Sequence, residues 1–332
     1  MRIFLLLTDR CNLHCSMCIR GRQHGDDMNL EEFSNLLDNE DFSNIELVVT
    51  GGEPTLHPYF VEFVKKASLH FRKVLIATNG TTHYYINELK ELDNVIFQIS
   101  LDGDEKSHDN IRGNGSYNKT FKTIKEFEAN NLNYCIASVV GNNNKNEIFS
   151  LIPYLEKLEK MKFWRISYEM PFGNAHSNNF LSAPEWNTFV DHILTKVNFK
   201  LLIKKIFPFE IYDKYLSQMD ITARNRCFNC GSGSNTIYVY PDFSVYPCTC
   251  LTDFCIGNLK TDSLKSILKG NKIQKFSKYK MNSDTPCHTC KYFSFCNGGC
   301  IGMSYHVMGS LGKGDIRCPI LRSYYEEKNI LL

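Results

Sequence analysis

Residues 11–18 read Cys11-Asn12-Leu13-His14-Cys15-Ser16-Met17-Cys18, a C-x3-C-x2-C set that directly follows the apolar run Ile3 to Leu7. The run has the length of a strand, so the three cysteines are expected on one short loop after it. Three thiolates on one loop can hold three irons of a [4Fe-4S] cube, which leaves the fourth iron without a protein ligand. An open iron is a reaction site, and the stretch therefore predicts chemistry on a molecule bound there.

Zinc binding and simple burial are the two alternatives for these cysteines. Zinc usually takes four Cys or His ligands arranged as two separated pairs, so a lone triplet fits it poorly, although His14 could add a ligand. Three buried structural cysteines would need no metal. The spacing favours the open cluster over both alternatives.

The spacing of the triplet and its place after a first strand resemble the signature of the radical S-adenosylmethionine (SAM) enzymes. Met17 stands where that family usually has an aromatic residue, a small departure because methionine is also large, apolar and adaptable. The resemblance implies that Cys11, Cys15 and Cys18 hold the catalytic cluster and that SAM chelates its open iron. One electron from the cluster would then cleave SAM to a 5′-deoxyadenosyl radical.

Composition bounds the kind of protein. With 332 residues, 43% of them apolar, the chain can fold as one barrel-sized domain plus a smaller one. The 38 basic and 36 acidic residues give a net charge of +2, so no broad footprint for nucleic acid is visible. No apolar run is long enough to span a bilayer, and no secretory pattern opens the chain. We expect a cytoplasmic protein whose 14 cysteines serve metal ligation rather than disulfides.

Residues 1 to about 200 alternate between strand-like and helix-like segments. Six such β/α units imply a parallel sheet with right-handed crossovers, and alternation alone allows either a partial barrel or a doubly wound sheet. The family resemblance implies the partial (β/α)6 TIM-like barrel. The expected strands are Ile3 to Thr8, Ile45 to Thr50, Val74 to Thr78, Val95 to Leu101, Tyr134 to Val139 and Phe163 to Tyr168. The expected helices are Leu30 to Asp38, Tyr59 to Ser68, Tyr84 to Leu92, Ser116 to Asn130, Asn146 to Lys160 and Ala183 to Lys196.

Polar and glycine residues follow the second, third and fourth strands, at the carboxyl ends where parallel sheets place their chemistry. Gly51, Gly52, Glu53 and Pro54 resemble the family's GGEP motif, which binds the amino group of SAM; a carboxylate beside glycines can accept a hydrogen bond from an ammonium group. An ordinary turn is the alternative.

The resemblance also assigns cofactor-binding roles to residues after the third and fourth strands. Ser100 and Asp102 are expected to contact the carboxylate or ribose of SAM, and Thr78 and Asn79 end the third strand. Arg112, in a pattern resembling H-D-x-x-R, is expected to pair with a carboxylate of SAM or of substrate. Capping or turn roles, and a structural salt bridge for Arg112, are the alternatives. Cys135 lies among apolar neighbours, which indicates packing.

Ten of the fourteen cysteines lie between Cys227 and Cys318, four of them as C-x2-C-x5-C-x3-C. This pattern resembles the SPASM domain, an auxiliary-cluster extension of radical SAM enzymes. The hairpin Tyr240 to Cys248 also matches, except that Phe243 stands where glycine is usual, so we expect a different turn type there. We expect a radical SAM core over residues 1–205, a bridging region over 206–226 and a SPASM domain over 227–332.

Two fully ligated [4Fe-4S] clusters need eight thiolates, and the seven cysteines that match the domain's pattern make eight together with Cys227. By resemblance, the first auxiliary cluster uses Cys227, Cys230, Cys248 and Cys300, and the second uses Cys287, Cys290, Cys296 and Cys318. Cys250 or Cys255 could take the place of Cys227. Zinc ribbons are the alternative for the paired cysteines.

The resemblance implies a peptide-modifying enzyme with SAM and three [4Fe-4S] clusters as cofactors. Its radical would abstract hydrogen from a ribosomal peptide and give a C–C or thioether crosslink or an epimerised residue. Formylglycine formation is an alternative, but Thr249 stands where sulfatase-maturing relatives have an aspartate base. A carbohydrate or small-molecule substrate is another. A non-catalytic electron carrier has no use for an open iron.

The implied partners are a precursor peptide or protein substrate and a flavodoxin- or ferredoxin-type electron donor. The chain starts directly at the first strand, without the winged-helix domain of many peptide maturases. We therefore expect it to recognise substrate through its own surface or through a separate leader-binding protein. Neither membrane nor nucleic acid is indicated.

Overall fold

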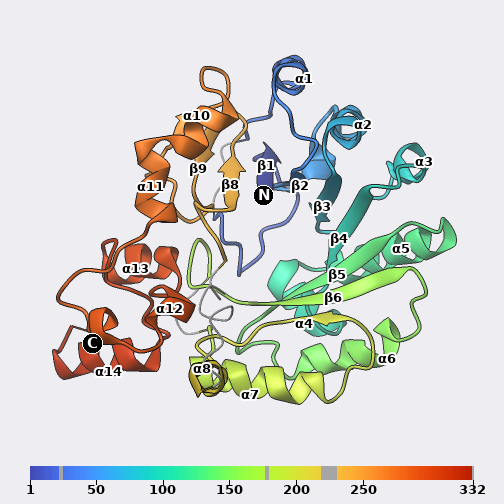
Figure 1. Cartoon of the computed structure of the whole chain (residues 1–332). Helices are drawn as coiled ribbons and strands as arrows, with labels where there is room; N and C mark the ends of the chain where they lie inside the picture. The colour runs from blue at the N-terminus through green and yellow to red at the C-terminus, as the bar shows by residue number, and fades with distance from the viewer. Residues whose placement is uncertain (22–24, 176–178, 218–229, 331–332) are drawn as a thin grey trace.

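The computed structural model describes residues 1–21, 25–175, 179–217 and 230–330 (Figure 1). All six predicted strands are present, and they pair in parallel in chain order. Their bounds are β1 Arg2–Thr8, β2 Glu46–Gly51, β3 Lys73–Thr78, β4 Val95–Ser100, β5 Tyr134–Val140 and β6 Met161–Tyr168. The short strand β7, Leu201–Leu202, pairs with β6.

Helices line the outer side of this curved sheet (Figure 1). Their buried faces meet the sheet in one core, in which Phe33 and Phe63 lie 4.9 Å apart and Phe97 lies 5.0 Å from Phe127 between ring centres. The predicted partial (β/α)6 barrel is confirmed. These helices are α1 Leu30–Asn39, α2 Phe60–His70, α3 Ile86–Leu89, α5 Ser116–Ala129, α6 Ile152–Leu155 and α7 Ala183–Leu194.

Three segments differ from the predicted helices. The helix predicted over 84–92 is only the four-residue α3, Ile86–Leu89. Helix α4, Glu105–Arg112, was not predicted; Asp104 caps it by accepting from the N–H of Ser107 at 2.8 Å. The segment predicted as one helix over 146–160 is a 3₁₀ helix, Glu147–Leu151, followed by the single turn of α6. Pro153 opens that turn, where a proline is tolerated because its missing N–H has no helical partner.

The cysteine-rich region extends the barrel sheet at the edge of β1. Strand β8, Thr236–Val239, pairs in parallel with β1. The predicted hairpin is formed by β8 and β9, Ser244–Tyr246, which pair antiparallel. Strand β10, Gly257–Asn258, pairs with the other edge of β9. The rings of Phe4 and Tyr238 stack across β1 and β8 at 4.6 Å. One ten-stranded sheet therefore joins both parts of the chain.

Phe243 does not change the hairpin turn as the sequence predicted. Its φ is 68°, in the left-handed region that glycine favours, so the phenylalanine adopts the strained conformation itself. The ring is buried, and Lys260 Nζ lies 5.2 Å from its centre. Burial of this ring offsets the cost of the backbone conformation.

The remaining helices of the described residues pack in the C-terminal half of the chain. Helix α8, Phe209–Ser217, lies within the predicted bridging region and stacks Phe209 on Tyr292 at 4.5 Å. The predicted domain boundary at 226/227 lies outside the described residues, and the three-region division stays a prediction. No described helix has the length and hydropathy needed to cross a membrane. The other helices are α10 Leu264–Lys269, α11 Asn271–Ser277, the 3₁₀ helix Pro286–Thr289, α12 Phe293–Cys296, α13 Ile301–Met308 and α14 Pro319–Glu327.

Candidate radical SAM site

The loop that carries Cys11, Cys15 and Cys18 follows β1 at the carboxyl edge of the sheet, and all three thiols are partly buried. Two distant segments hold its backbone. The N–H of Ser16 donates to the carbonyl of Ile111 in α4 at 2.9 Å. Asn174 donates through its backbone N–H to the carbonyl of Cys18 at 2.9 Å and through its side chain to that of Cys15 at 3.2 Å. The loop is therefore positioned by the barrel rather than by its own sequence.

The three thiols of this loop provide ligands for three irons of a [4Fe-4S] cube. Among the described residues, no three Cys, His, Asp or Glu side chains are arranged to hold one metal ion, and His14 is exposed. A [4Fe-4S] cube takes each thiolate on a different iron, so its ligands need not converge on one point. Burial raises the pKa of Cys11 to about 11, so this sulfur remains a thiol until bound iron favours the thiolate.

Gly51 and Gly52 bring the end of β2 against the segment that leads into the cysteine loop. The N–H of Gly52 donates to the carbonyl of Thr8 at 2.7 Å, and that of Glu53 donates to the carbonyl of Arg10 at 2.7 Å. A Cβ on Gly51 would lie 2.2 Å from the carbonyl oxygen of Thr8, and one on Gly52 would lie 2.2 Å from that of Arg10. The glycines are required by this close approach of two backbones.

Glu53 is buried and accepts hydrogen bonds from the 3₁₀ helix that follows it and from the end of β3. Its Oε1 accepts from the hydroxyls of Thr55 and Thr78, both at 2.7 Å, and from the N–H of Thr55 at 3.3 Å. Its Oε2 accepts from the N–H of Asn79 at 2.7 Å. Burial raises the pKa of Glu53, and these hydrogen bonds oppose the rise. Pro54 is buried beside it and opens a 3₁₀ helix, Pro54–Leu56.

The same network reaches the cysteine loop. Asn79 donates from its side chain to the side-chain oxygen of Asn12, between Cys11 and Cys15, at 2.9 Å. The structure thus joins Glu53, Thr78 and Asn79, three of the residues singled out in the sequence, to the loop. No role was predicted for Asn12, because an asparagine between two cysteines carries no recognisable signal.

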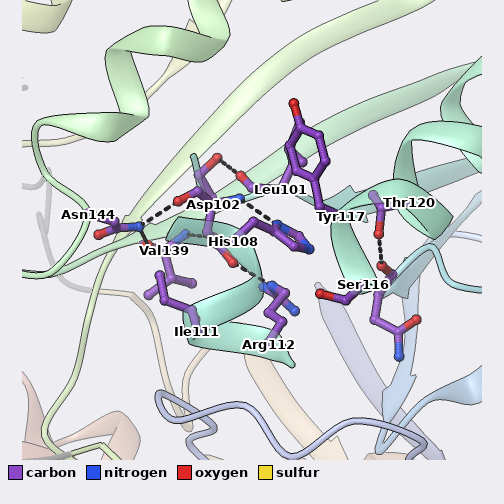
Figure 2. Close-up of polar contacts among 12 residues, drawn as sticks. Leu101, Asp102, His108, Ile111, Arg112, Ser116, Tyr117, Thr120, Val139 and Asn144 are labelled. Carbon is purple, nitrogen blue, oxygen red and sulfur yellow. Dashed lines mark hydrogen bonds and ion pairs between the residues drawn. The ribbon is translucent and has the colours of Figure 1, made fainter. Parts of the chain in front are cut away.

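Asp102 is fully buried just after β4, and its surroundings are shown in Figure 2. Its carboxylate accepts from the N–H of Val139 at 2.7 Å and pairs with Nε of Arg112. Its backbone N–H donates to Nδ1 of His108 at 3.2 Å. Burial lowers the pKa of His108 to about 4, so this imidazole is neutral at pH 7. Ser100, which ends β4, is half-buried.

Arg112 lies close enough to Cys15 and Cys18 to interact with both electrostatically, and its charge opposes the burial that raises the pKa of Cys15. The structural salt bridge considered as an alternative therefore exists, between Arg112 and Asp102. Its position also places a buried positive charge beside the cysteine loop. Within the H-D-x-x-R pattern, Asp109 instead accepts hydrogen bonds from the N–H groups of Gly115 and Tyr117 at the start of α5.

The C-terminal cysteines lie in two groups. Cys230, Cys248 and Cys300 line one cavity of about 590 Å³. A second, apolar cavity is lined by the other group, Cys287, Cys290, Cys296 and Cys318, together with Phe207, Phe209 and Leu321. Cys227 lies outside the described residues. Cys250 hydrogen-bonds the thiol of Cys248, whereas Cys255 is exposed and donates to the carbonyl of Gly257 at 3.4 Å. Cys135 is buried in β5, as predicted.

The ion pair of Asp315 with Arg317 connects the first cysteine group to the barrel. It is nearly buried, and the sequence did not reveal it. Asp315 accepts from the N–H of Cys300 at 3.0 Å. The guanidinium of Arg317 lies 4.9 Å from the ring centre of Tyr168 in β6. The region around Cys300 is thus fixed to the carboxyl edge of the sheet.

Comparison with known proteins matches two family models to this chain. The radical SAM superfamily model matches residues 5–152, and an iron-sulfur cluster-binding domain model, SPASM, matches residues 230–291. The first match contains the cysteine loop, Glu53 and Asp102, and the second contains the hairpin with Cys230 and Cys248.

Two curated relatives cover most of the chain. A cysteine-type anaerobic sulfatase-maturating enzyme of Clostridium novyi is 27% identical over 97% of this chain and 93% of its own length. The antilisterial bacteriocin subtilosin biosynthesis protein AlbA of Bacillus subtilis is 29% identical over 89% of this chain, which spans 65% of AlbA.

Solved structures share the fold. Streptococcus suis SuiB bound to precursor peptide SuiA has a TM-score of 0.79 at 14% identity, over 97% of this chain and 75% of SuiB. Native anSMEcpe with bound AdoMet, which is SAM, has a TM-score of 0.71 at 20% identity, over 99% of this chain and 97% of that chain. The protein is therefore an enzyme of the radical SAM superfamily with a SPASM domain, and its cofactors are SAM and [4Fe-4S] clusters.

Proposed function

We propose that the enzyme modifies a ribosomally made peptide. Its radical removes a hydrogen atom from the peptide, and the product is a C–C or thioether crosslink or an epimerised residue. The observation that carries this proposal is the meeting of three elements at one sheet edge: the cysteine loop, the Glu53 network and the Asp102–Arg112 pair. The first group of C-terminal cysteines adjoins this edge through Asp315 and Arg317. Relatives that act in peptide maturation, AlbA and SuiB among them, support the substrate class.

Cys11, Cys15 and Cys18 would hold the cluster whose open iron binds SAM, and reductive cleavage of bound SAM supplies the radical. The protein positions these thiolates through Ser16 and Asn174, and Arg112 supplies a compensating positive charge. Because Arg112 is buried with its counter-ion Asp102, its charge is fixed in place before any ligand binds.

Glu53 and Arg112 are the residues that we assign to the amino and carboxylate groups of SAM. Oε2 of Glu53 accepts one hydrogen bond from a described residue and can accept a second from an ammonium group. Arg112 pairs with Asp102 through Nε, so its two Nη groups remain to donate to a carboxylate. In this proposal the surrounding site is formed by Gly51, Gly52, Pro54, Thr78, Asn79, Ser100 and Asp102.

Replacing Glu53 tests its role. Glu53→Gln keeps the volume and one oxygen but removes the charge, and we expect it to weaken SAM binding by about tenfold or more, the loss of one hydrogen bond to a charged group. Iron content should be unchanged, because no thiolate is altered. Equilibrium dialysis with labelled SAM and iron analysis measure the two effects.

Thr55→Val is the matched control for Glu53→Gln, because it removes a hydroxyl that donates to the same carboxylate without changing the charge. It should leave SAM affinity within about threefold, because the hydrogen bond that it removes is made to Glu53 and not to the ligand. Equal SAM affinity in Glu53→Gln and the wild type would make Glu53 a purely structural residue.

Cys250 is our candidate for the fourth thiolate of the first auxiliary cluster, beside Cys230, Cys248 and Cys300. Its N–H donates to the sulfur of Cys248 at 3.5 Å, and a Cβ on Gly302 would lie 3.3 Å from Cys250 Cβ and 3.5 Å from Cys300 Sγ. Cys250 and Cys300 therefore flank the same glycine.

Single replacements distinguish the three possible fourth ligands. We expect Cys250→Ala to lower iron content by up to about four per chain, one cube, and to change the electron paramagnetic resonance signal of one cluster. Cys255→Ala should change neither. If Cys227→Ala lowers the iron content and Cys250→Ala does not, Cys227 is the ligand.

Formylglycine formation is the second candidate, favoured by the long match to the C. novyi enzyme. It requires a base beside the target residue, and Thr249 is a poor base at neutral pH. This is why we rank peptide crosslinking or epimerisation first.

Mass spectrometry of a peptide encoded beside the enzyme and co-expressed with it tests the proposed function. Loss of two hydrogens indicates a crosslink, and an unchanged mass with deuterium gained from solvent indicates epimerisation. Conversion of a cysteine to formylglycine, in which oxygen replaces sulfur and two hydrogens are lost, would instead establish the sulfatase-maturase activity. Unmodified peptide, together with a modified sugar or small molecule, would contradict the proposal.

A further inference from the structure

Helices α10 and α11 and the three residues that follow α11 carry a dense set of lysines, which we call the lysine face. No acidic residue occurs in residues 263–283, so this stretch contributes +6 to a chain whose net charge is +2, and the remainder carries −4. All six lysines of this stretch are exposed. The lysine face consists of Lys265, Lys269, Lys272, Lys275, Lys278 and Lys280.

These lysines differ from others in the same half of the chain. Lys260 pairs with Glu32, Lys291 with Asp213 and Lys313 with Asp284. In contrast, none of the ion pairs within the described part of the chain includes a residue of the lysine face. Nζ of Lys278 donates to a neutral side chain, Oε1 of Gln274, at 3.4 Å. A cluster of unneutralised like charges costs stability and attracts an acidic partner.

The inner side of α11 borders the first cysteine group. Phe276 is buried on α11, and Phe276 and Ser277 line the cavity that also contains Cys230, Cys248 and Cys300. A Cβ on Gly233 would lie 2.4 Å from Phe276 Cβ, so α11 packs directly on the turn after Cys230. Figure 1 places α10 and α11 at the outer edge of the molecule, beyond β8 and β9. About one helix diameter, roughly 10–12 Å, separates the lysine face from this cavity.

We propose that the lysine face docks an acidic one-electron carrier protein, which delivers the electron for SAM cleavage beside the first auxiliary cluster. The inference rests on the proposed function, because each SAM cleavage consumes one electron. The carrier is oxidised by one electron, the C5′–S bond of SAM breaks, and methionine and the 5′-deoxyadenosyl radical result. A redox partner fits this face better than nucleic acid does, because the positive charge is confined to two short helices next to a cysteine cavity.

Charge reversal on α11, with an equal change elsewhere, tests the docking site. The test variant is Lys272→Glu, Lys275→Glu and Lys278→Glu together. The control is Lys119→Glu, Lys122→Glu and Lys125→Glu, three exposed lysines on α5 with the same total change in charge. Equilibrium binding of reduced and oxidised flavodoxin is measured at low and high salt. We expect the α11 variant to bind at least about tenfold more weakly and to lose most of its salt dependence, while the α5 variant binds like the wild type.

SAM cleavage with two reductants separates docking from catalysis. With reduced flavodoxin, formation of 5′-deoxyadenosine by the α11 variant should fall about as much as binding does. With dithionite, which needs no docking site, the variant and the wild type should be equal. Lys→Gln replacements at the same three positions should give a smaller loss of the same kind.

Three results of the binding experiments would overturn the inference: unchanged flavodoxin binding by the α11 variant, equally weakened flavodoxin binding by the α5 variant, or binding of an acidic peptide but not of flavodoxin. Equal loss of SAM cleavage with both reductants would overturn it as well. Failure of the wild type to cleave SAM even with dithionite would contradict the proposed function instead, and the flavodoxin binding comparison would still decide whether this face is a docking site.

Discussion

Replacing Cys11, Cys15 and Cys18 together by alanine should remove about a third of the protein's iron and abolish SAM cleavage. Three [4Fe-4S] clusters contain about twelve irons, and the triplet holds one cluster of four. The loss of activity should be complete, because no other described cysteine group lies at the ends of β1 to β4 where SAM binds in our proposal. Iron analysis and chromatographic detection of 5′-deoxyadenosine measure the two effects.

Cys135→Ala is the control for this triple variant, because Cys135 is buried in β5 away from any cysteine group. It should keep its iron and activity and lose only some stability through the small cavity it leaves. Full iron and full activity in the triple variant would show that the central assignment is wrong.

Replacing Cys287 and Cys290 by alanine should eliminate modified peptide while sparing part of the SAM cleavage. Both line the second cysteine cavity, so the variant should lose about four of twelve irons. If all eight auxiliary thiolates are used, neither auxiliary cluster has an open iron, and these clusters act by moving electrons. A peptide radical is strongly reducing, and a crosslink needs a cluster to accept its electron.

The readout for this double variant is the ratio of modified peptide to 5′-deoxyadenosine, with Cys255→Ala as control. The ratio should fall to near zero in the Cys287/Cys290 variant and stay at the wild-type value in the control. A normal ratio would exclude the electron-acceptor role. A radical that persists on the substrate only in the Cys255 variant, or in a Cys250 variant that keeps its full iron content, would favour epimerisation, in which an unligated thiol returns a hydrogen atom.

The strands could be predicted because each is a short apolar run followed by a glycine, a hydroxyl or an acid. Val74 to Thr78 and Tyr134 to Val139 are typical, and each lies within one residue of an observed strand. Helix α4 was missed because its sequence, Glu105–Arg112, is almost entirely polar and lacks the apolar period of a surface helix. Two of its buried residues, His108 and Arg112, make polar contacts instead.

The site residues could be located from their place after strands, but their partners could not. Glu53 and Asn79 were expected at neighbouring strand ends, yet their hydrogen bond depends on the register of β2 and β3. The pairing of Arg112 with Asp102 depends in the same way on the direction in which α4 leaves β4. Ion pairs between residues ten apart, as here, carry no sequence signal.

Phe243 shows the limit of substitution rules for turns. The absence of glycine suggested another turn type, because a β-carbon is disfavoured at positive φ. The structure retains the left-handed backbone, since the buried ring packs under Lys260. Tertiary packing decided the conformation, and that packing involves residues that are distant in sequence from the hairpin turn.

The most direct measurement of the central claim is hydrogen transfer from the peptide to the 5′-deoxyadenosyl radical. A precursor peptide with deuterium at its carbon positions is incubated with reduced enzyme and SAM, and the 5′-deoxyadenosine is analysed by mass spectrometry. Our account predicts one deuterium per molecule of 5′-deoxyadenosine formed with this peptide, in proportion to modified peptide. Unlabelled 5′-deoxyadenosine beside a modified peptide, or no 5′-deoxyadenosine at all, would contradict it.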